Sequence, residues 1–219
     1  MKIDYKNYFT NQFKNTYTKG AIEEYKQWFY AQWNVIKNYT KIDEQSRILE
    51  LGSGMGGLYS LLQDEYGNIQ YHGTELDAKA VQFSNTYFKT NCFEEIAIED
   101  MNVKKHYTHI FAFEVLEHLM NPIEDIEKIY ALLEPGGIFI GTSPYPYEKN
   151  IIADKTHLHV LHPTNWKRLF EIHGFKKVHT MPMSFFPFLW RIHRAINPVI
   201  PIYLPFPKFI STTLIIAHK

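Results

Sequence analysis

The feature that most constrains the fold of this chain is a glycine-rich turn between a short apolar run and a helical pattern. Residues 47–51 read Arg-Ile-Leu-Glu-Leu, and residues 52–57 read Gly-Ser-Gly-Met-Gly-Gly. An apolar run of this kind is typical of a strand buried on both faces. Glycines accept positive φ and let a ligand approach the backbone, and a following helix directs unpaired N–H groups at the turn. The stretch therefore predicts a strand, turn and helix that hold a nucleotide-like group.

Two ligands fit this turn. Gly52, Gly54 and Gly57 satisfy the G-x-G-x-x-G dinucleotide pattern, and Glu75 follows at the spacing of a ribose-binding acid. Glu50, however, precedes the first glycine, and its carboxylate would repel a pyrophosphate. A cationic ligand such as S-adenosylmethionine, with a sulfonium and an ammonium group, would not be repelled. A turn without any ligand is the third reading, disfavoured because such a turn beside a buried acid is costly without a purpose.

Two motifs carry a resemblance to a known family. The run Glu-Leu-Gly-Ser-Gly-Met-Gly at residues 50–56 resembles the E-x-G-x-G-x-G signature of class I S-adenosylmethionine-dependent methyltransferases. Glu-Val-Leu-Glu-His-Leu at residues 114–119, followed by Leu-Leu-Glu-Pro-Gly-Gly at 132–137, resembles the second half of the small-molecule and ubiquinone-biosynthesis O-methyltransferases. The resemblance spans about residues 47–142 and continues more weakly to the C-terminus. It implies a Rossmann-like sheet of seven strands in the order 3-2-1-4-5-7-6, with the last strand antiparallel.

The periodicity of the chain agrees with this fold class. Strand and helix patterns alternate through residue 142, which favours an open, mostly parallel α/β sheet with helices on both faces. The expected strands cover residues 47–51, 68–74, 95–98, 109–113, 138–142, 175–180 and 211–218. The expected helices cover residues 21–39, 58–65 and 78–89, with two more that start at Asn121-Pro122 and at Thr164. We expect residues 1–219 to form one methyltransferase domain, with a helical cap at 1–40 and an insert at 181–210.

Composition excludes several classes of function. The chain has 23 basic and 23 acidic residues and no net charge, which argues against binding to a nucleic-acid backbone. Its one cysteine, Cys92, rules out an intrachain disulfide and suits a reducing compartment. The first residues lack the apolar core of a signal peptide, and no uncharged apolar run reaches the length of about 18 residues that a membrane span needs. We therefore expect a cytoplasmic protein, whose oligomeric state the sequence does not indicate.

The resemblance implies S-adenosyl-L-methionine as the cofactor and assigns its contacts. Glu75 would accept the ribose hydroxyls, Asp100 would meet the adenine amino group, and Met101 would lie along the adenine ring. Asp100 reads nearly as well as a solvated loop acid, and Asp77 is expected to cap the helix at 78–89. The full set of expected cofactor-binding residues is Glu50, Gly52, Ser53, Gly54, Gly56, Glu75, Leu76, Asp100, Met101 and Glu114.

The implied reaction is methyl transfer to a small molecule, which the resemblance places at oxygen. Because the donor is already activated, much of the catalysis is alignment of the reacting atoms. An acceptor hydroxyl with a pKa of about 10 also benefits from a base, for which His118 is the first candidate and His157 the second. His118 can instead be a structural residue that bonds backbone near the adenine pocket. Phe113-Glu114-Val115-Leu116 replaces the Asn/Asp-Pro-Pro-Tyr/Phe motif of enzymes that methylate DNA and amide nitrogens. The alternatives are a degenerate scaffold subunit of the same fold and an NAD-dependent dehydrogenase.

Two groups of residues raise the question of a metal. Glu114, Glu117 and His118 would share one face if their segment were helical, and some ubiquinone-pathway relatives with this pattern need a divalent ion. A second group consists of Asp154, His157, His159 and His162. The second group lacks the helical i, i+4 pair with a carboxylate that indicates a metal site, and many relatives with the first pattern are not known to use an ion. We therefore expect no metal.

The segment at residues 181–210 combines many aromatic residues with six prolines, which forbid one long helix. One reading is an irregular cover packed over the core. The other is a hydrophobic lid that admits an apolar acceptor and makes a weak peripheral contact with a membrane through Phe186 and Trp190.

Overall fold

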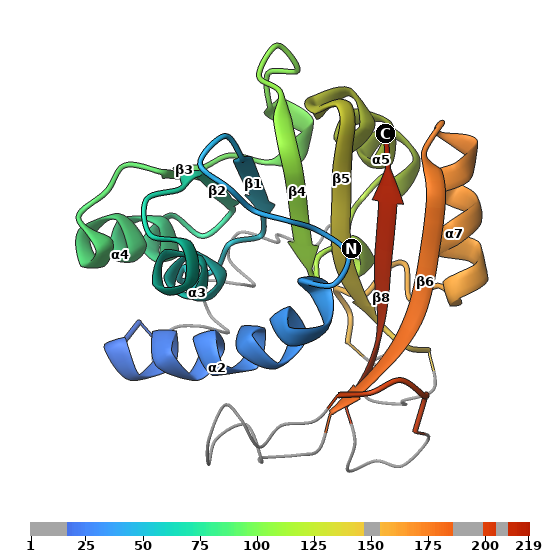
Figure 1. Ribbon diagram of the computed structural model, residues 1–219, viewed down its shortest axis with the longest axis horizontal. Coiled ribbons are helices and arrows are strands. Elements are labelled where there is room, and N and C mark those ends of the chain that lie inside the picture. Colours follow the sequence, from blue (N-terminus) through green and yellow to red (C-terminus); the bar gives the residue numbers. More distant parts are fainter. Residues whose placement is uncertain (1–16, 147–153, 186–198, 205–209) are drawn as a thin grey trace.

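The computed structural model describes residues 17–146, 154–185, 199–204 and 210–219 (Figure 1). The strands are β1 Arg47–Leu51, β2 Gln70–Glu75, β3 Phe93–Glu95, β4 Tyr107–Phe113, β5 Leu133–Pro144, β6 Lys176–Phe185, β7 Val199–Ile200 and β8 Ile210–His218. The helices are α2 Lys19–Ile36, α3 Gly57–Tyr66, α4 Ala78–Phe88, α5 Pro122–Leu132 and α7 Pro163–Ile172. Two 3-10 turns, η1 Ile98–Asp100 and η2 Leu116–His118, complete the described elements.

These strands form one sheet in the order β3-β2-β1-β4-β5-β8-β6-β7. The pairs from β3 to β5 are parallel, whereas β8 is antiparallel to both β5 and β6 (Figure 1). The expected fold class is confirmed, but the expected number of seven strands is wrong. The additional strand is β7, which pairs with Ser184 and Phe185 of β6 at the edge of the sheet.

Several element boundaries also differ from expectation. The third strand covers Phe93–Glu95 and not the expected residues 95–98, and Ile98–Asp100 form η1. Helix α7 is capped by His162 and not by Thr164, because the His162 Nδ1 accepts a hydrogen bond of 3.3 Å from the Thr164 N–H. Strand β6 continues to Phe185, so it takes in the first residues of the expected insert. Residues 1–16, 147–153, 186–198 and 205–209, with Phe186 and Trp190 among them, lie outside the described residues.

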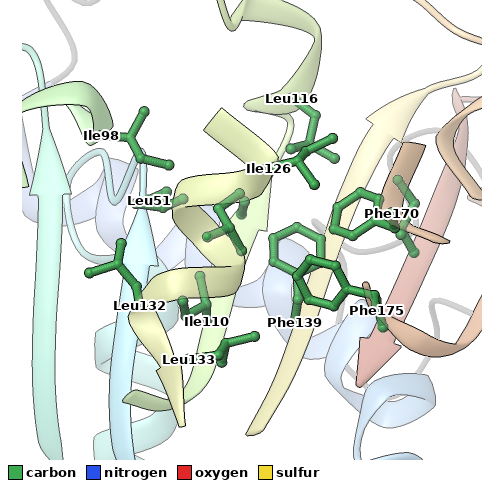
Figure 2. Packing of buried hydrophobic residues seen from close by; sticks show 14 of the residues in the cluster. Leu51, Ile98, Ile110, Leu116, Ile126, Leu132, Leu133, Phe139, Phe170 and Phe175 are labelled. Carbon is green, nitrogen blue, oxygen red and sulfur yellow. The ribbon is translucent and has the colours of Figure 1, made fainter. Parts of the chain in front are cut away.

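The alternation of side chains along β1 divides the core into two layers. Leu49 and Leu51 face the layer beneath α5 and α7, while Ile48 faces the layer beneath α2 and α3. Figure 2 shows the first layer, in which Leu51 and Phe139 of the sheet pack with side chains of the covering helices. Since Glu50 alternates with Leu49 and Leu51, its carboxylate is directed to the layer that contains α3.

From the order of the strands, a ligand is expected at the carboxyl ends of β1 and β4. The chain leaves β1 toward β2 on one side and leaves β4 toward β5 on the other, and ligands of open α/β sheets bind where the strand order reverses in this way. Helix α2 lies at this edge, toward which the arrowhead of β4 points in Figure 1. The ring of Phe29 packs at 5.2 Å on Phe113 at the end of β4, and Trp28 packs at 4.3 Å on Phe185 at the end of β6. In the described part of the chain, no helix is both long and apolar enough to cross a membrane.

Candidate active site

In the turn after β1, two glycines allow close packing, and a third leaves open space for a ligand. A Cβ atom on Gly52 would lie 2.5 Å from Val115 Cγ2, and one on Gly56 would lie 2.7 Å from the ring of Phe88. A Cβ atom on Gly54 would have no protein atom within 4 Å, although its φ of +51° is strained for any other residue. Gly54 is therefore the position at which a ligand can approach the backbone, whereas Gly52 and Gly56 allow close packing around the turn.

Glu75, the expected ribose-binding acid, is bonded to the same turn. Its Oε2 accepts a hydrogen bond of 2.9 Å from the Gly54 N–H, and its Oε1 accepts bonds of 2.7 and 3.1 Å from the N–H groups of Leu76 and Asp77. Burial raises the pKa of Glu75, and the three N–H donors oppose that shift. A carboxylate has about four acceptor positions, so about one remains for a ligand hydroxyl. The bond to Gly54 is a second role that sequence reasoning missed.

Glu50 is buried below the turn and does not behave as a simple anion. Its side chain accepts a hydrogen bond from the hydroxyl of Tyr71. Burial, reinforced by the nearby Glu75 and opposed by the bond from Tyr71, raises the pKa of Glu50 to about 8. Burial thus favours the protonated form of this side chain. The repulsion of a pyrophosphate by Glu50, argued from the sequence, stays a prediction.

The remaining expected cofactor residues occupy different environments. The hydroxyl of Ser53 is directed at Gly73 beneath the turn, where a Cβ on Gly73 would lie 2.9 Å from it. Leu76 is half-buried beside Glu75, and Asp100 is exposed at the end of η1. Met101 is buried in the core layer beneath α5, so its side chain packs against the protein.

Asp77 has the capping role expected of it and one further contact. Its Oδ1 accepts a hydrogen bond of 3.1 Å from the Lys79 N–H at the start of α4. Its Oδ2 accepts a bond from the hydroxyl of Tyr17, the residue before the N-cap of α2. Burial raises the pKa of Tyr17, and Asp77 and the nearby Glu75 raise it further. Tyr17 therefore lies close to the expected ribose site, which no local pattern in the sequence indicates.

Glu114 adopts a strained backbone conformation directly after β4. Its φ is +53°, which is uncommon for a residue with a side chain and costs about 1–3 kcal/mol. Its N–H donates to the carbonyl and the hydroxyl of Thr142 at 3.1 and 3.2 Å, and its Oε1 accepts a bond of 2.8 Å from the Thr212 hydroxyl. Burial raises the pKa of this carboxyl. Neighbouring strands thus hold a strained residue at the carboxyl edge, as is common at functional sites.

Next to Glu114, the structure brings together both expected catalytic histidines. The rings of His118 and His157 meet edge to face at a centroid distance of 4.8 Å, and His118 Nε2 lies 3.9 Å from Oε1 of Glu117. One ligand atom from each of Glu117, His118 and His157 lies within 4.8 Å of the others. The helical face expected for Glu114, Glu117 and His118 does not form, because only residues 116–118 turn, as η2, and Glu114 has positive φ.

The contacts of His118 define its protonation. Its Nδ1 lies 3.1 Å from the Thr156 carbonyl oxygen, which accepts only, so Nδ1 carries the hydrogen and Nε2 the lone pair. Burial and, less strongly, the nearby His157 lower the pKa of His118 to about 4, so the ring is neutral at pH 7. Burial raises the pKa of Glu117 well above its usual value, and Glu114 adds to this. A hydrogen bond from the Ser143 side chain opposes this shift.

The histidines that follow His157 have other surroundings. The backbone N–H of His159 donates to the Glu117 carbonyl at 3.1 Å, and the side chain of His162 caps α7. The second metal cluster considered from the sequence is therefore not formed as a unit within the described part of the chain. Two surface hollows of about 300 and 490 Å³ border Gly137 and Gln70, at the opposite edge of the sheet, and contain none of the expected site residues.

Comparisons with known proteins agree with this geometry. A methyltransferase-domain family model matches residues 30–180, more than half of the chain. Among curated protein sequences, none matches significantly.

Solved structures of methyltransferases share the fold. A phosphoethanolamine N-methyltransferase of Haemonchus contortus, in complex with S-adenosyl-L-methionine, aligns with a TM-score of 0.69 and 15% identity over 100% of this chain. The present chain spans 60% of that protein. S-adenosylmethionine-dependent methyltransferases of Thermotoga maritima and Archaeoglobus fulgidus align with TM-scores of 0.70 and 0.64 at 16% and 20% identity. These two alignments cover 97% and 99% of this chain and 99% and 100% of the others.

The family decides between the ligands considered for the turn. S-adenosylmethionine is the cofactor, and the residues fit it, because Gly54 presents open backbone next to a carboxylate with acceptor capacity for a ribose. The chain is an enzyme that belongs to the class I S-adenosylmethionine-dependent methyltransferases.

Proposed function

We propose that this enzyme methylates an oxygen atom of a small, largely apolar molecule, and that the acceptor oxygen lies at Glu117, His118 and His157. One observation carries the proposal. The bond from Nδ1 of His118 to the Thr156 carbonyl directs the Nε2 lone pair into the cluster next to the end of β4. A fixed, neutral imidazole at the carboxyl edge of the sheet is suited to accept a proton from a hydroxyl group.

The cofactor would be held by the backbone at Gly54 and by the carboxylate of Glu75. When bound, the cofactor would supply the methyl group. The O–C bond would form as the C–S bond breaks, and the electron pair of the broken bond would stay on sulfur, which gives S-adenosylhomocysteine. The turn and the end of β2 are joined by the Gly54–Glu75 bond, so the two parts of the cofactor site are already fixed relative to one another. This rigidity serves the alignment on which methyl transfer depends.

The role of His118 is to take the hydroxyl proton on Nε2. A histidine with a pKa of about 4 is a weak base for a free hydroxyl. The proton becomes strongly acidic as the O–C bond forms, however, so a weak base that is correctly placed accepts it late in the reaction. His157 packs on the ring of His118 and restricts its orientation.

The surroundings of the carboxyl edge support an apolar acceptor. Phe29 packs on Phe113 there, and the rings of Tyr145 and Tyr203 stack at 3.6 Å. We infer that residues 1–40 act as a cap over this edge, with α2 as its described part, within one domain that spans residues 1–219. The proposed membrane contact rests on the sequence alone, since Phe186 and Trp190 lie outside the described residues. The cytoplasmic setting is part of the same proposal and rests on the single cysteine.

The proposal is tested with His118→Ala and a panel of hydroxylated aromatic compounds and amines, with labelled S-adenosylmethionine as the donor. We expect label on oxygen, and a fall of about 10²–10⁴-fold in kcat for His118→Ala, the usual contribution of a general base. Affinity for S-adenosylhomocysteine, measured by calorimetry, should not change. His106→Ala, at an exposed histidine just before β4 and thus at the other end of that strand from the cluster, is the matched control. Full turnover by His118→Ala, or label on nitrogen alone, would contradict the proposal.

A further inference from the structure

We propose that Gln32 of α2 binds a second polar group of the acceptor, a neutral group that both donates and accepts a hydrogen bond, such as a hydroxyl or a carboxamide. The side-chain amide of Gln32 thereby helps to select the molecule that is methylated. The inference rests on the proposed function only where it calls this molecule the acceptor. Binding at Gln32 does not depend on which atom receives the methyl group.

The first observation is that the amide of Gln32 is buried and unpaired. The residue is 1% exposed, and neither its Nε2 nor its Oε1 has a hydrogen-bond partner among the described residues. The large majority of buried side-chain polar atoms in native proteins are paired, and an amide can donate two hydrogen bonds and accept two. The unpaired amide therefore calls for a partner from outside the chain.

The second observation is the position of this amide on α2. Helix periodicity places Gln32 one turn after Trp28 and Phe29 and between them, on the face that packs on the sheet. The ring of Trp28 packs at 4.3 Å on Phe185 of β6, and the ring of Phe29 packs at 5.2 Å on Phe113 of β4. The amide is therefore directed at the two strands that lie between β4 and β6, which are β5 and β8.

This position suits the acceptor better than the cofactor. The expected cofactor site at Gly54 and Glu75 lies at the ends of β1 and β2, on one side of β4. The strands β5 and β8 lie on the other side of β4. A molecule bound at Gln32 thus approaches the cofactor from the side opposite to the glycine turn.

The third observation is a pair of buried hydroxyl groups at the ends of β5 and β8. Thr142 and Thr212 alternate with Ile140 and Leu214, which belong to the core layer beneath α2, so both hydroxyls face α2 as well. Each threonine is at most 2% exposed. Both threonine side chains form hydrogen bonds with the carboxyl of Glu114, and the bond from Thr212 is 2.8 Å long. The layer opposite Gln32 is therefore polar at this edge.

Glu114 connects these hydroxyls to the proposed base. It lies close enough to Glu117 to raise the pKa of that carboxyl. Glu117 itself accepts a hydrogen bond from Ser143, whose position on β5 faces the other core layer, beneath α5 and α7. An acceptor that lies across the end of β5 can therefore present its reactive hydroxyl to His118 on one face of the sheet and its second polar group to Gln32 on the other.

The chemistry around Gln32 favours a neutral group on an aromatic frame. A carboxylate would be repelled by Glu114 when that residue is charged, and an ammonium group would leave the amide nitrogen of Gln32 unpaired. A hydroxyl or a carboxamide can accept from the amide nitrogen and donate to the amide oxygen. The neighbouring rings supply an apolar surface for the rest of the molecule: Trp28, Phe29, Phe113 and Phe185.

The test compares three neutral phenols that differ only opposite the phenolic hydroxyl, namely para-hydroxybenzamide, para-hydroxybenzyl alcohol and para-cresol. Their binding to the full chain saturated with S-adenosylhomocysteine is measured by ligand-observed NMR, which requires no turnover. We expect the amide and the alcohol to bind wild type at least about tenfold more tightly than para-cresol, because a site built for a hydrogen bond disfavours a molecule that lacks it. In Gln32→Leu this preference should disappear. Gln27→Leu, at a half-buried glutamine of the same helix, should keep it.

Urea unfolding without any ligand gives a second readout. Because Gln32→Leu removes unpaired polar atoms from an apolar face, this variant should be at least as stable as wild type. Its affinity for S-adenosylhomocysteine should not change, since the amide is not directed at the cofactor.

Three results would overturn the inference: no preference among the phenols in wild type, a preference retained by Gln32→Leu, or a Gln32→Leu protein that is less stable than wild type. The last result would show that the amide has a partner within the protein. Methyl transfer to nitrogen alone, with the preference for the amide and the alcohol intact, would instead count against the proposed function.

Discussion

Replacement of Glu75 by alanine should weaken the binding of S-adenosylmethionine and of S-adenosylhomocysteine, because the carboxylate is expected to accept the ribose hydroxyls. The geometry limits the size of this effect. Three of about four acceptor positions are occupied by the N–H groups of Gly54, Leu76 and Asp77. One strong, charge-assisted bond to the ribose therefore remains, worth about 1.5–3 kcal/mol, which corresponds to a loss of about one to two decades in affinity.

The same substitution should also destabilise the protein for a separate reason. Without the carboxylate, the N–H groups of Gly54 and Leu76 lose their acceptor at a half-buried position. Water can replace part of these bonds, so we expect a loss of about 1–3 kcal/mol in the free energy of unfolding. Glu75→Gln keeps the shape and one acceptor oxygen. It should therefore fall between wild type and Glu75→Ala in both quantities.

Calorimetric titration with S-adenosylhomocysteine gives the affinity, and urea unfolding without ligand gives the stability. Glu65→Ala removes an exposed acid at the end of α3 and should change neither quantity. An affinity of Glu75→Ala within threefold of wild type, together with lowered stability, would refute the ribose contact and leave only the structural role. If stability did not change either, the bond between Glu75 and the turn would be refuted as well.

Two further predictions concern the same turn. Gly54→Val should abolish S-adenosylhomocysteine binding in calorimetry, because its side chain would occupy the open space at the turn. Gly67→Val, also at positive φ and in open space, should keep binding, and equal binding by both variants would contradict the assignment. In the folded protein the pKa of Glu50 is about 8, against an ordinary value of 4.5, so only the folded state keeps this proton between these pH values. The free energy of unfolding should therefore fall as pH rises from 4.5 to 8, by at most about 1.4 kcal/mol per pH unit. Urea unfolding from pH 5 to 8 should show this slope in wild type and a smaller one in Glu50→Gln, and identical slopes would disprove the burial effect.

The parts of the fold that the sequence predicted are those decided by local pattern. The strand at 47–51 and its turn were predicted because glycine spacing and an apolar run are properties of consecutive residues. The capping of α4 by Asp77 was predicted for the same reason. The order of the strands was available only through the resemblance, since pairing between distant strands leaves no local pattern.

The parts that the sequence did not predict depend on contacts between distant segments. The helical face expected at Glu114 fails because its N–H bonds to Thr142 of β5, which holds the residue at positive φ. The meeting of His118 with His157 depends on backbone bonds from residues 158 and 159 to Glu117. The extra strand β7 exists only by pairing with Ser184 and Phe185. Each of these outcomes is set by tertiary hydrogen bonds, which the spacing of residues along the chain does not indicate.

The position of β8 has a consequence for biosynthesis. This strand is the latest in the sequence, yet it lies in the interior of the sheet and pairs with β5 and β6 on either side. While the ribosome is still making residues 210–218, β5 and β6 therefore have no partner between them. Two unpaired edges of this kind invite contacts with other nascent chains. The sheet must consequently be completed after translation has passed residue 218. Mutations that slow the pairing of β8 with β5 and β6 should lower the yield of folded enzyme more than the activity of the enzyme that does fold.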